Sequence, residues 1–367
     1  MTGAMYAGIS GLKSHMNKLN VIGNNIANVN TYGYKTARTT FREAIYTTMT
    51  AGSDGTDLVG GTNPSQIGYG CNIGTIDLDM SNGPAVPTGV NLDCMIQGDG
   101  FFMVGDKSGV KPNDLDSLKL TKVGNFHFDK SGYLVDGYGQ VVYGFVTVAG
   151  QTQNGQFKPE ADAAPDKGTG TTGPSTQLVP IRLPLAALKD DPDNKIAAGD
   201  PIYPGVNQAG ENVQSTDPDL VNPDKTVAVN VDSIAVDKTG KITATTENNK
   251  VITVGYIALG KVENPAGLTH LDGPYYQALS GAGDLAVTTA GGAVSGCLNN
   301  QDPQQNQNAV RIVGSDNSLL SGFLEGSGTD LATEFSEMIT TQRGYQANTR
   351  IVTVTDSMLE ELVNMKR

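Results

Sequence analysis

The chain of 367 residues contains no tryptophan, only 6% aromatic residues and only three cysteines. Glycine is abundant instead, with 46 residues, or about 12% against an average of about 7%. Hydrophobic residues make up 38% of the chain, enough for a core, and the length suffices for two or three ordinary domains. Many glycines and few aromatics favour frequent turns and light cores, so we expect a mostly β chain.

Long hydrophobic runs and an excess of basic charge are also missing. No window approaches the ~18 consecutive apolar residues of a membrane-spanning helix, so we expect no membrane insertion. The net charge of −13 offers nothing to neutralise a phosphate backbone, which argues against nucleic acid and against an anionic membrane surface. The first residues lack the basic flank and apolar core of a cleaved signal peptide, so any export is expected to use another route.

Neither the cysteines nor the histidines form a recognisable chemical site. The cysteines are odd in number and widely spaced, which predicts no CxxC pair and no disulfide framework, so we expect small buried hydrophobes. They are Cys71, Cys94 and Cys297. The histidines lie in no HxxH or HExxH pattern, so no zinc site is expected. They are His15, His127 and His270.

Two runs elsewhere resemble ligand-binding motifs, but neither meets the requirements of its site. Residues 168–173 match GxGxxG, but no helix pattern follows them to bind a pyrophosphate. Residues 77–83 resemble a calcium loop, but Gly is missing at the sixth place and Thr88 stands where Glu belongs. We therefore expect no catalytic residue, no cofactor and no metal. A nucleophile assembled from distant residues stays open.

Both ends of the chain carry helical patterns. Apolar residues recur at steps of three and four, which keeps them on one face of a helix. The N-terminal stripe consists of Met5, Ile9, Leu12, Met16, Leu19, Ile22 and Ile26. The C-terminal stripe consists of Leu331, Phe335, Met338, Tyr345, Val352, Leu359 and Leu362. The second helix would be a rod of about 55 Å. We call these 14 residues the stripe residues.

The two ends also differ in charge. Residues 1–42 contain five basic residues and no acidic one, whereas residues 325–367 carry seven acids against four bases. Opposite charges would favour pairing of the two helices and set its register. Two solvated faces of unrelated polarity fit the charge equally well, but a narrow apolar stripe must be buried. We expect the stripe residues to pack within one chain, between copies, or both.

Alternating segments between the ends predict antiparallel β-structure. The expected strands are residues 101–104, 118–128, 141–148, 227–236 and 251–262. Two similar runs, Asp-Lys-Ser-Gly at 129–132 and Asp-Lys-Thr-Gly at 237–240, predict hairpin turns. Ten of the 17 prolines fall in residues 147–230, which predicts a loop-rich insert within a β-domain.

Three segments resemble the bacterial flagellar rod and hook proteins. Residues 24–35 resemble the family's Asn-rich helix end followed by Thr-x-Gly-aromatic-Lys, with Asn24, Asn25, Asn28, Thr31, Gly33 and Lys35 as motif residues. A second segment resembles the Gly-x-Gly-Phe-Phe strand entry, with Gly98, Gly100, Phe101 and Phe102. The third resembles the C-terminal helix and includes Gln342 and Arg343. Together with a region at 232–280, the resemblance covers the two ends and residues 90–146.

The resemblance implies a multidomain α+β structural protein and not an enzyme. Long N- and C-terminal helices would form a coiled-coil core domain, with nested antiparallel all-β outer domains. The implied division is a core of residues 1–30 and 325–367, an extended connecting segment of 31–70 that braces neighbouring copies, a discontinuous β-domain of 71–146 and 231–324, and an inserted outer β-domain of 147–230. The stripe residues would form the assembly interface.

Within the family, hook proteins carry an outer insertion that the shorter rod proteins lack. The insert at 147–230 therefore favours a hook subunit that polymerises into a bendable, torque-transmitting tube, with the distal rod as the alternative. The implied partners are further copies of the chain, other axial proteins (rod, hook–filament junction and hook cap) and the flagellar export apparatus. A secreted adhesin or glycan-acting protein is an alternative of a different class.

Overall fold

The computed structural model describes residues 2–54, 60–107, 115–153, 156–159, 171–187, 201–202, 205–206, 212–213, 226–247, 249–294, 296–298 and 311–365. They fall into two compact units, Met1–Ser81 with Ser327–Arg367, and Asn82–Gly326. The chain is mostly β, with one long helix near each end, as expected from the composition and the terminal periodicity.

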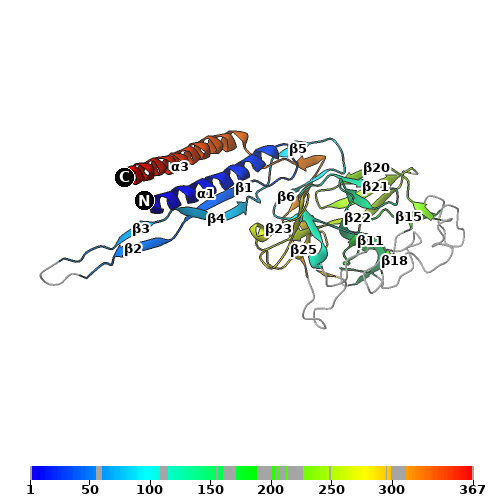
Figure 1. Ribbon diagram of the computed structural model, residues 1–367. Helices are drawn as coiled ribbons and strands as arrows, with labels where there is room; N and C mark the ends of the chain where they lie inside the picture. The colour runs from blue at the N-terminus through cyan, green and yellow to red at the C-terminus, as the bar shows by residue number, and fades with distance from the viewer. Residues whose placement is uncertain are drawn as a thin grey trace. The chain divides into compact units, whose positions relative to one another are not determined.

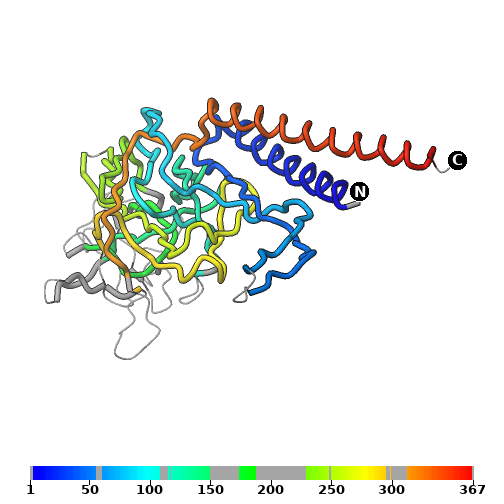
Figure 2. The backbone as a smooth tube through the Cα atoms, turned by 90° about the vertical axis from the view of Figure 1, so that its left-hand side faces the viewer, coloured from blue at the N-terminus to red at the C-terminus, as the bar shows by residue number. Residues whose placement is uncertain are grey.

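In the first unit the two predicted helices are present and lie side by side (Figures 1 and 2). They are α1 (Thr2–Ala27) and α3 (Leu331–Met365). They run in opposite directions, so both ends of the chain lie at the same end of the pair. Neither helix, nor any other that the structure describes, is long and apolar enough to span a membrane.

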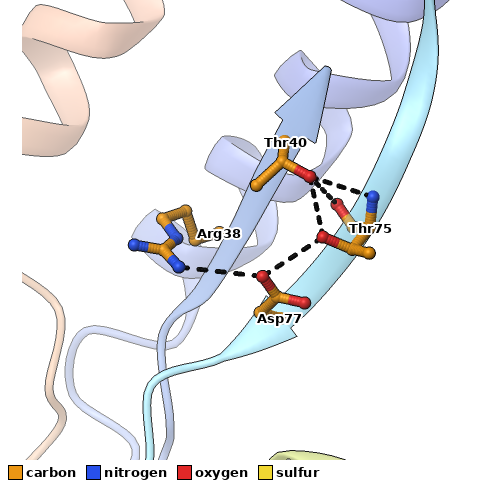
Figure 3. Close-up of polar contacts among 4 residues, drawn as sticks. All are labelled: Arg38, Thr40, Thr75 and Asp77. Carbon is orange, nitrogen blue, oxygen red and sulfur yellow. Dashed lines mark hydrogen bonds and ion pairs between the residues drawn. The ribbon is translucent and has the colours of Figure 1, made fainter. Parts of the chain in front are cut away.

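Two antiparallel ribbons follow α1 in the same unit. β1 (Ala37–Glu43) pairs with β4 (Cys71–Leu78), and β2 (Tyr46–Thr50) pairs with β3 (Ser65–Gly68). The first ribbon contains a bulge between Thr39 and Phe41. At this bulge the Thr40 side chain replaces a backbone acceptor of the strand pair (Figure 3). Its hydroxyl accepts a hydrogen bond from the Thr75 N–H at 3.0 Å and lies 2.7 Å from the Thr75 hydroxyl.

The ribbon changes the boundary expected from the sequence. The sequence predicts that the β-domain begins at residue 71, but β4 pairs with β1, and the first unit continues to Ser81. The extended segment is therefore two paired ribbons, because its strands satisfy their backbone hydrogen bonds against one another.

The second unit is built around a 16-stranded sheet. Its centre is β7 (Phe101–Gly105), β11 (Val141–Gln153) and β22 (Val251–Lys261). The remaining strands of the sheet are β8 (Lys119–Thr121), β9 (Phe126–Phe128), β10 (Leu134–Asp136), β12 (Gln156–Pro159), β13 (Thr171–Pro174), β14 (Val179–Pro180), β20 (Val231–Val236), β21 (Lys241–Thr246), β23 (Thr269–His270), β24 (Tyr275–Gln277), β25 (Ala286–Thr289), β26 (Gly296–Cys297) and β27 (Arg311–Gly314). Its pairings are antiparallel apart from β25 with β27.

Smaller pairings complete the second unit. β15 (Leu185–Ala187) lies between β16 (Pro201–Ile202) and β19 (Thr226–Ala228), and β17 (Gly205–Val206) pairs with β18 (Asn212–Val213). The chain enters through β5 (Ala85–Pro87) and β6 (Cys94–Gln97), which pair with the exit strands β29 (Phe323–Glu325) and β28 (Ser318–Ser321). The described residues also contain the 3-10 turns η1 (Leu115–Ser117), η2 (Pro265–Gly267) and η3 (Ala290–Gly292).

Both predicted hairpin turns are present. β9 and β10 are joined through Gly132 at φ 81°, and β20 and β21 through Gly240 at φ 76°, a backbone region that glycine adopts without strain. The prediction of one strand over 118–128 is wrong. Residues 122–125 separate β8 from β9. In this segment the backbone of Gly124 lies against that of Cys94, whose N–H donates to Gly124 O at 2.9 Å.

The described parts of the predicted insert do not stand apart from the second unit. β12, β13 and β14 all pair with β11, and Ile181, Leu183 and Val229 lie in the main hydrophobic core. Residues 168–170 of the GxGxxG run lie outside the described residues, and the run ends in strand β13. Cys94 is buried, as expected, and Cys71 is half-buried.

Candidate functional site: the terminal helix pair and its polar junction

Glycines bring the two terminal helices into close contact. A Cβ on Gly8 would lie 3.2 Å from the Val352 side chain, and one on Gly11 would lie 2.8 Å from the Asn348 amide. On the opposite helix, a Cβ on Gly344 would lie 2.8 Å from the His15 ring. The helices therefore approach along a face of small and polar residues, and a side chain at these positions would push them apart.

The stripe residues lie largely beside this contact. Ile22 is buried. Half-buried are Met5, Leu12, Leu19, Ile26, Met338, Val352 and Leu359. Exposed are Ile9, Met16, Leu331, Phe335, Tyr345 and Leu362. Their place in an assembly interface stays a prediction, but the single chain does not bury them as one apolar seam.

One ion pair joins the helices among the described residues. Lys18 Nζ lies 3.0 Å from Glu337 Oε2, and both side chains keep access to solvent. Such a pair adds little stability but fixes an alignment of basic α1 against acidic α3. Among the described residues, the opposite charges of the two helices therefore meet in this one ion pair.

Asn25 joins three elements at the far end of the helix pair. Its amide nitrogen donates to Ala37 O and to Glu334 Oε1, both at 2.9 Å. Its amide oxygen accepts the Ala37 N–H at 3.1 Å and the Tyr34 hydroxyl at 3.0 Å. The side chain is 1% exposed, and it pairs with Ala37 as a neighbouring strand would. Asn25 therefore connects α1 to β1 and to α3 with every amide hydrogen-bonding position used.

The other Asn-rich motif residues form the turn that leaves α1. Asn28 Nδ2 donates to Asn24 O at 2.9 Å, and the Thr31 hydroxyl donates to Asn28 Oδ1 at 3.1 Å. Asn24 Nδ2 donates to the Tyr34 hydroxyl at 3.0 Å. Gly33 then reverses the chain at φ 69°, where a Cβ would be strained. The motif is thus a helix end whose side chains hold the first ribbon in position.

Lys35 adds a further contact at the same end of that ribbon. Its side chain is only 2% exposed, and Nζ donates to Ser81 O at 2.6 Å and to Met80 O at 3.4 Å. Three donors on one ammonium suit carbonyl groups at the end of a strand. Lys35 therefore ties the beginning of β1 to the residues that follow β4.

A hollow of about 460 Å³ opens where these elements meet. Its charged lining consists of Lys18, Arg38, Asp77, Asp79, Asp330, Glu334 and Glu337. Arg38 lies 3.7 Å from Asp77 across the ribbon (Figure 3). Burial raises the pKa of Glu334 above its ordinary value; Glu337 and Asp330 add to the rise, while Asn25 and Lys18 oppose it. Hydrogen bonds from Thr333 and Ala332 lower the pKa of Asp330, the residue that caps α3.

The second motif lies in the core of the other unit. Gly98 has φ 119°, and a Cβ there would collide with the Asn317 side chain. Asn317 Nδ2 donates to Asp99 O, and a Cβ on Gly100 would lie 3.0 Å from the same nitrogen. Phe101 and Phe102 follow as fully buried residues of β7. The Gly-x-Gly-Phe-Phe motif is therefore a strand entry packed around Asn317.

The remaining motif residues face solvent. Gln342 and Arg343 are exposed on α3, between the buried Thr341 and the half-buried Gly344. Among the described residues no group of three or more His, Cys, Asp or Glu side chains could hold a metal ion. His15 contacts Phe41, and His270 contacts Tyr276, edge to face.

Sequence reasoning missed three parts of this site. It did not find the close-contact glycines Gly8, Gly11 and Gly344, the Asn25–Glu334 bond, or the role of Asn317. Glycines do not contribute to the apolar periodicity from which the helix faces were predicted. The only sign of the close contact in the sequence was the spacing of Gly8 and Gly11, which places them on one face of the helix. Asn25 and Glu334 are 309 positions apart. Nothing local in the sequence joins them.

A pair of long terminal helices with exposed apolar side chains, joined to a β-rich body, is typical of structural proteins that assemble. Three family models match the chain. Residues 5–35 match "Flagella basal body rod protein", residues 95–163 match "Flagellar hook protein FlgE/F/G D1 domain", and residues 320–365 match "Flagellar basal body rod FlgEFG protein C-terminal".

Curated relatives extend this similarity to the whole chain. The flagellar basal-body rod protein FlgG of Bacillus subtilis is 30% identical over 367 residues, with 100% of both chains covered. The flagellar hook protein FlgE of Borreliella burgdorferi is 26% identical over 473 residues, again with 100% of both covered. The crystal structure of the Helicobacter pylori hook protein FlgE2 shows 13% identity and a TM-score of 0.31, covering 65% of this chain and 100% of that one.

The chain belongs to the family of flagellar hook and rod proteins. It is a structural subunit of the flagellar hook, since hook proteins align with it from end to end and one model is that of a hook domain. The distal rod is the less favoured alternative. Members of this family are structural proteins of the flagellar axis, in the hook and basal body, and function in motility.

Proposed function

We propose that copies of the chain polymerise through their terminal helices into a helical tube that bends and transmits motor torque. One observation carries this proposal: the helix pair keeps large apolar side chains in contact with water. Phe335 is 50% exposed and Ile9 is 50% exposed, and Ile339 on α3 is 58% exposed. Exposed apolar surface of this extent marks an interaction site.

The close contact between α1 and α3 explains why those side chains stay available. Because Gly8, Gly11 and Gly344 bring the backbones together, the contact uses a narrow face of each helix. The apolar residues on the flanking faces are then free to pack against further copies as a coiled-coil core. A contact between two different faces of identical subunits does not close on itself and generates a helical polymer.

The ribbon of β2 and β3 is a second candidate for contacts between copies. Tyr46, Met49 and Ile67 on it are all exposed. Two strands with apolar side chains and open edges are unstable alone in water. We propose that this ribbon braces a neighbouring copy, as the family resemblance implies for the extended segment.

The proposal also covers how the chain divides into core and outer regions, and which proteins it contacts. The stripe residues would form the core contacts, and the residues from 82 to 326 would form the outer β-region, with the proline-rich insert outermost. Partners would be further copies, the adjoining rod, junction and cap proteins, and the export apparatus. This role requires no catalysis and no cofactor.

A double substitution on α3 tests the proposal. Phe335→Ser with Tyr345→Ser removes two exposed apolar side chains, so the monomer should fold as before while polymerisation is lost. Light scattering and electron microscopy of the concentrated full chain measure assembly, and circular dichroism measures the fold. Tyr138→Ser, at an exposed tyrosine of the second unit, is the matched control and should still polymerise. Filaments from the double variant would refute assembly through the helices.

Electron microscopy of cells that lack the gene separates hook from rod. A basal body with an intact rod and no hook agrees with the hook assignment. A truncated rod would instead support the distal rod.

A further inference from the structure

The hollow beside the helix pair contains a carboxylate, Glu334, that is largely buried in the single chain. Glu334 is 9% exposed, and its bond to Asn25 is made with a neutral amide. A charged carboxylate in such a place is costly unless a cation or several donors compensate it.

The charged groups around Glu334 come from every element that lines the hollow. α1 contributes Lys18 and β1 contributes Arg38. The neutral hydroxyl of Tyr34, in the turn before β1, is bonded to Asn25 nearby. β4 and the residues after it contribute two acids, Asp77 and Asp79, and α3 contributes two more, Asp330 and Glu337. Acids therefore outnumber cations around this carboxylate.

Both cations of the lining already have carboxylate partners. Lys18 pairs with Glu337 at 3.0 Å and Arg38 with Asp77 at 3.7 Å. Glu334 is therefore surrounded mainly by other acids, and its hydrogen-bond partner is the neutral side-chain amide of Asn25. Water in the hollow is the remaining means of solvating its charge.

The neighbours of Glu334 on α3 are the residues that the proposed assembly would cover. Leu331 is 39% exposed and Phe335 is 50% exposed. A second copy packed on these side chains would remove water from the region beside Glu334. Loss of water disfavours the ionised form of a carboxyl group.

We propose that assembly of the helices takes up a proton at Glu334, so that mild acidification promotes polymerisation. This inference rests on the proposed function. The proton comes from solvent and stays on the carboxyl group, which keeps its bond to Asn25 through the carbonyl oxygen.

The sign of the pH dependence follows from linkage. Burial already raises the pKa of Glu334 in the single chain, and further loss of water would raise it more. A group whose pKa is higher in the assembled state favours assembly at low pH, and this contribution disappears as the pH rises through the assembled-state pKa. Each pKa unit gained on assembly corresponds to about a tenfold lower critical concentration at acidic pH.

The test compares Glu334→Gln with Glu360→Gln in the full chain, because Glu360 is an exposed carboxylate of α3 that does not line the hollow. Each variant removes one negative charge from the same helix, so general effects of net charge are matched. The critical concentration is measured by sedimentation between about pH 7.5 and about pH 5.5, above the sequence pI of about 4.6. Wild type and Glu360→Gln should assemble several-fold more readily at the acidic end, whereas Glu334→Gln should assemble readily and independently of pH.

Proton uptake gives a second readout. Assembly of the wild type in weakly buffered solution should raise the pH, and assembly of Glu334→Gln should not. An unchanged pH dependence in Glu334→Gln, or its loss in both variants, would overturn the inference alone. A wild-type chain that forms no polymer at any pH would overturn the proposed function as well.

Discussion

At the residue scale, Asn25 shows how one side chain replaces a missing strand. β1 begins at Ala37. The side-chain amide of Asn25 bonds both the N–H and the C=O of Ala37, as the backbone of a neighbouring strand would. The same amide donates to Glu334, so the end of α1, the start of β1 and the start of α3 depend on one group. Buried polar groups of this kind are costly to leave unpaired.

Asn25→Ala should therefore destabilise the first unit far more than its size suggests. It leaves the Ala37 backbone groups and the Glu334 carboxylate without their partner, and we expect a loss of about 3 kcal/mol in the free energy of unfolding. Urea denaturation followed by the helical circular dichroism signal measures this loss.

Asn24→Ala is the matched control, because Asn24 is exposed and bonds the Tyr34 hydroxyl. We expect it to cost less than about 1 kcal/mol. Equal losses in the two variants would show that Asn25 is not the connecting residue described above.

At the element scale, periodicity predicted the helices well and their contact poorly. Steps of three and four placed α1 and α3 near their observed positions. The face that makes the contact was missed, because large apolar residues dominate the pattern whereas Gly11 and Gly344 allow the closest approach. Hairpins could be predicted since their turn chemistry is local, but the pairing of β4 with β1 joins residues more than 25 positions apart.

Gly11→Leu should separate the helices, whereas Gly23→Leu should not. A side chain at position 11 meets the Asn348 amide, while nothing lies within 4 Å of a Cβ on Gly23. We expect Gly11→Leu to lose about 2 kcal/mol of stability through overpacking, and Gly23→Leu to gain up to about 0.8 kcal/mol from helix propensity.

Thermal unfolding of the helical signal compares these two variants directly. Because both replace a glycine of α1 by the same residue, differences in intrinsic helix propensity cancel. A Gly11→Leu protein as stable as Gly23→Leu would mean that α1 and α3 do not pack closely in solution.

At the scale of the whole molecule, the chain combines a helical unit that has exposed apolar side chains with a β-unit whose strands pair with one another. The second unit closes where the chain enters and leaves it, since β5 pairs with β29 and β6 with β28. Its core is formed by its own strands. The first unit leaves several large apolar side chains exposed, so it has more apolar surface available to a partner.

Removing residues 327–367 should therefore abolish polymerisation and leave the second unit folded. α1 would lose the helix against which Gly8 and Gly11 pack, and every exposed apolar residue of α3 would be lost with it. The strand signal in circular dichroism should persist, gel filtration should show a monomer, and electron microscopy should show no tubes.

The closed pairing of the entry and exit strands is the reason to expect a folded remainder, because the cut after Gly326 falls just beyond β29. Loss of the strand signal would show that the second unit needs the helices to fold. Tubes formed without α3 would show that the outer β-region alone drives assembly, and the proposed role of the helix pair would then be untenable.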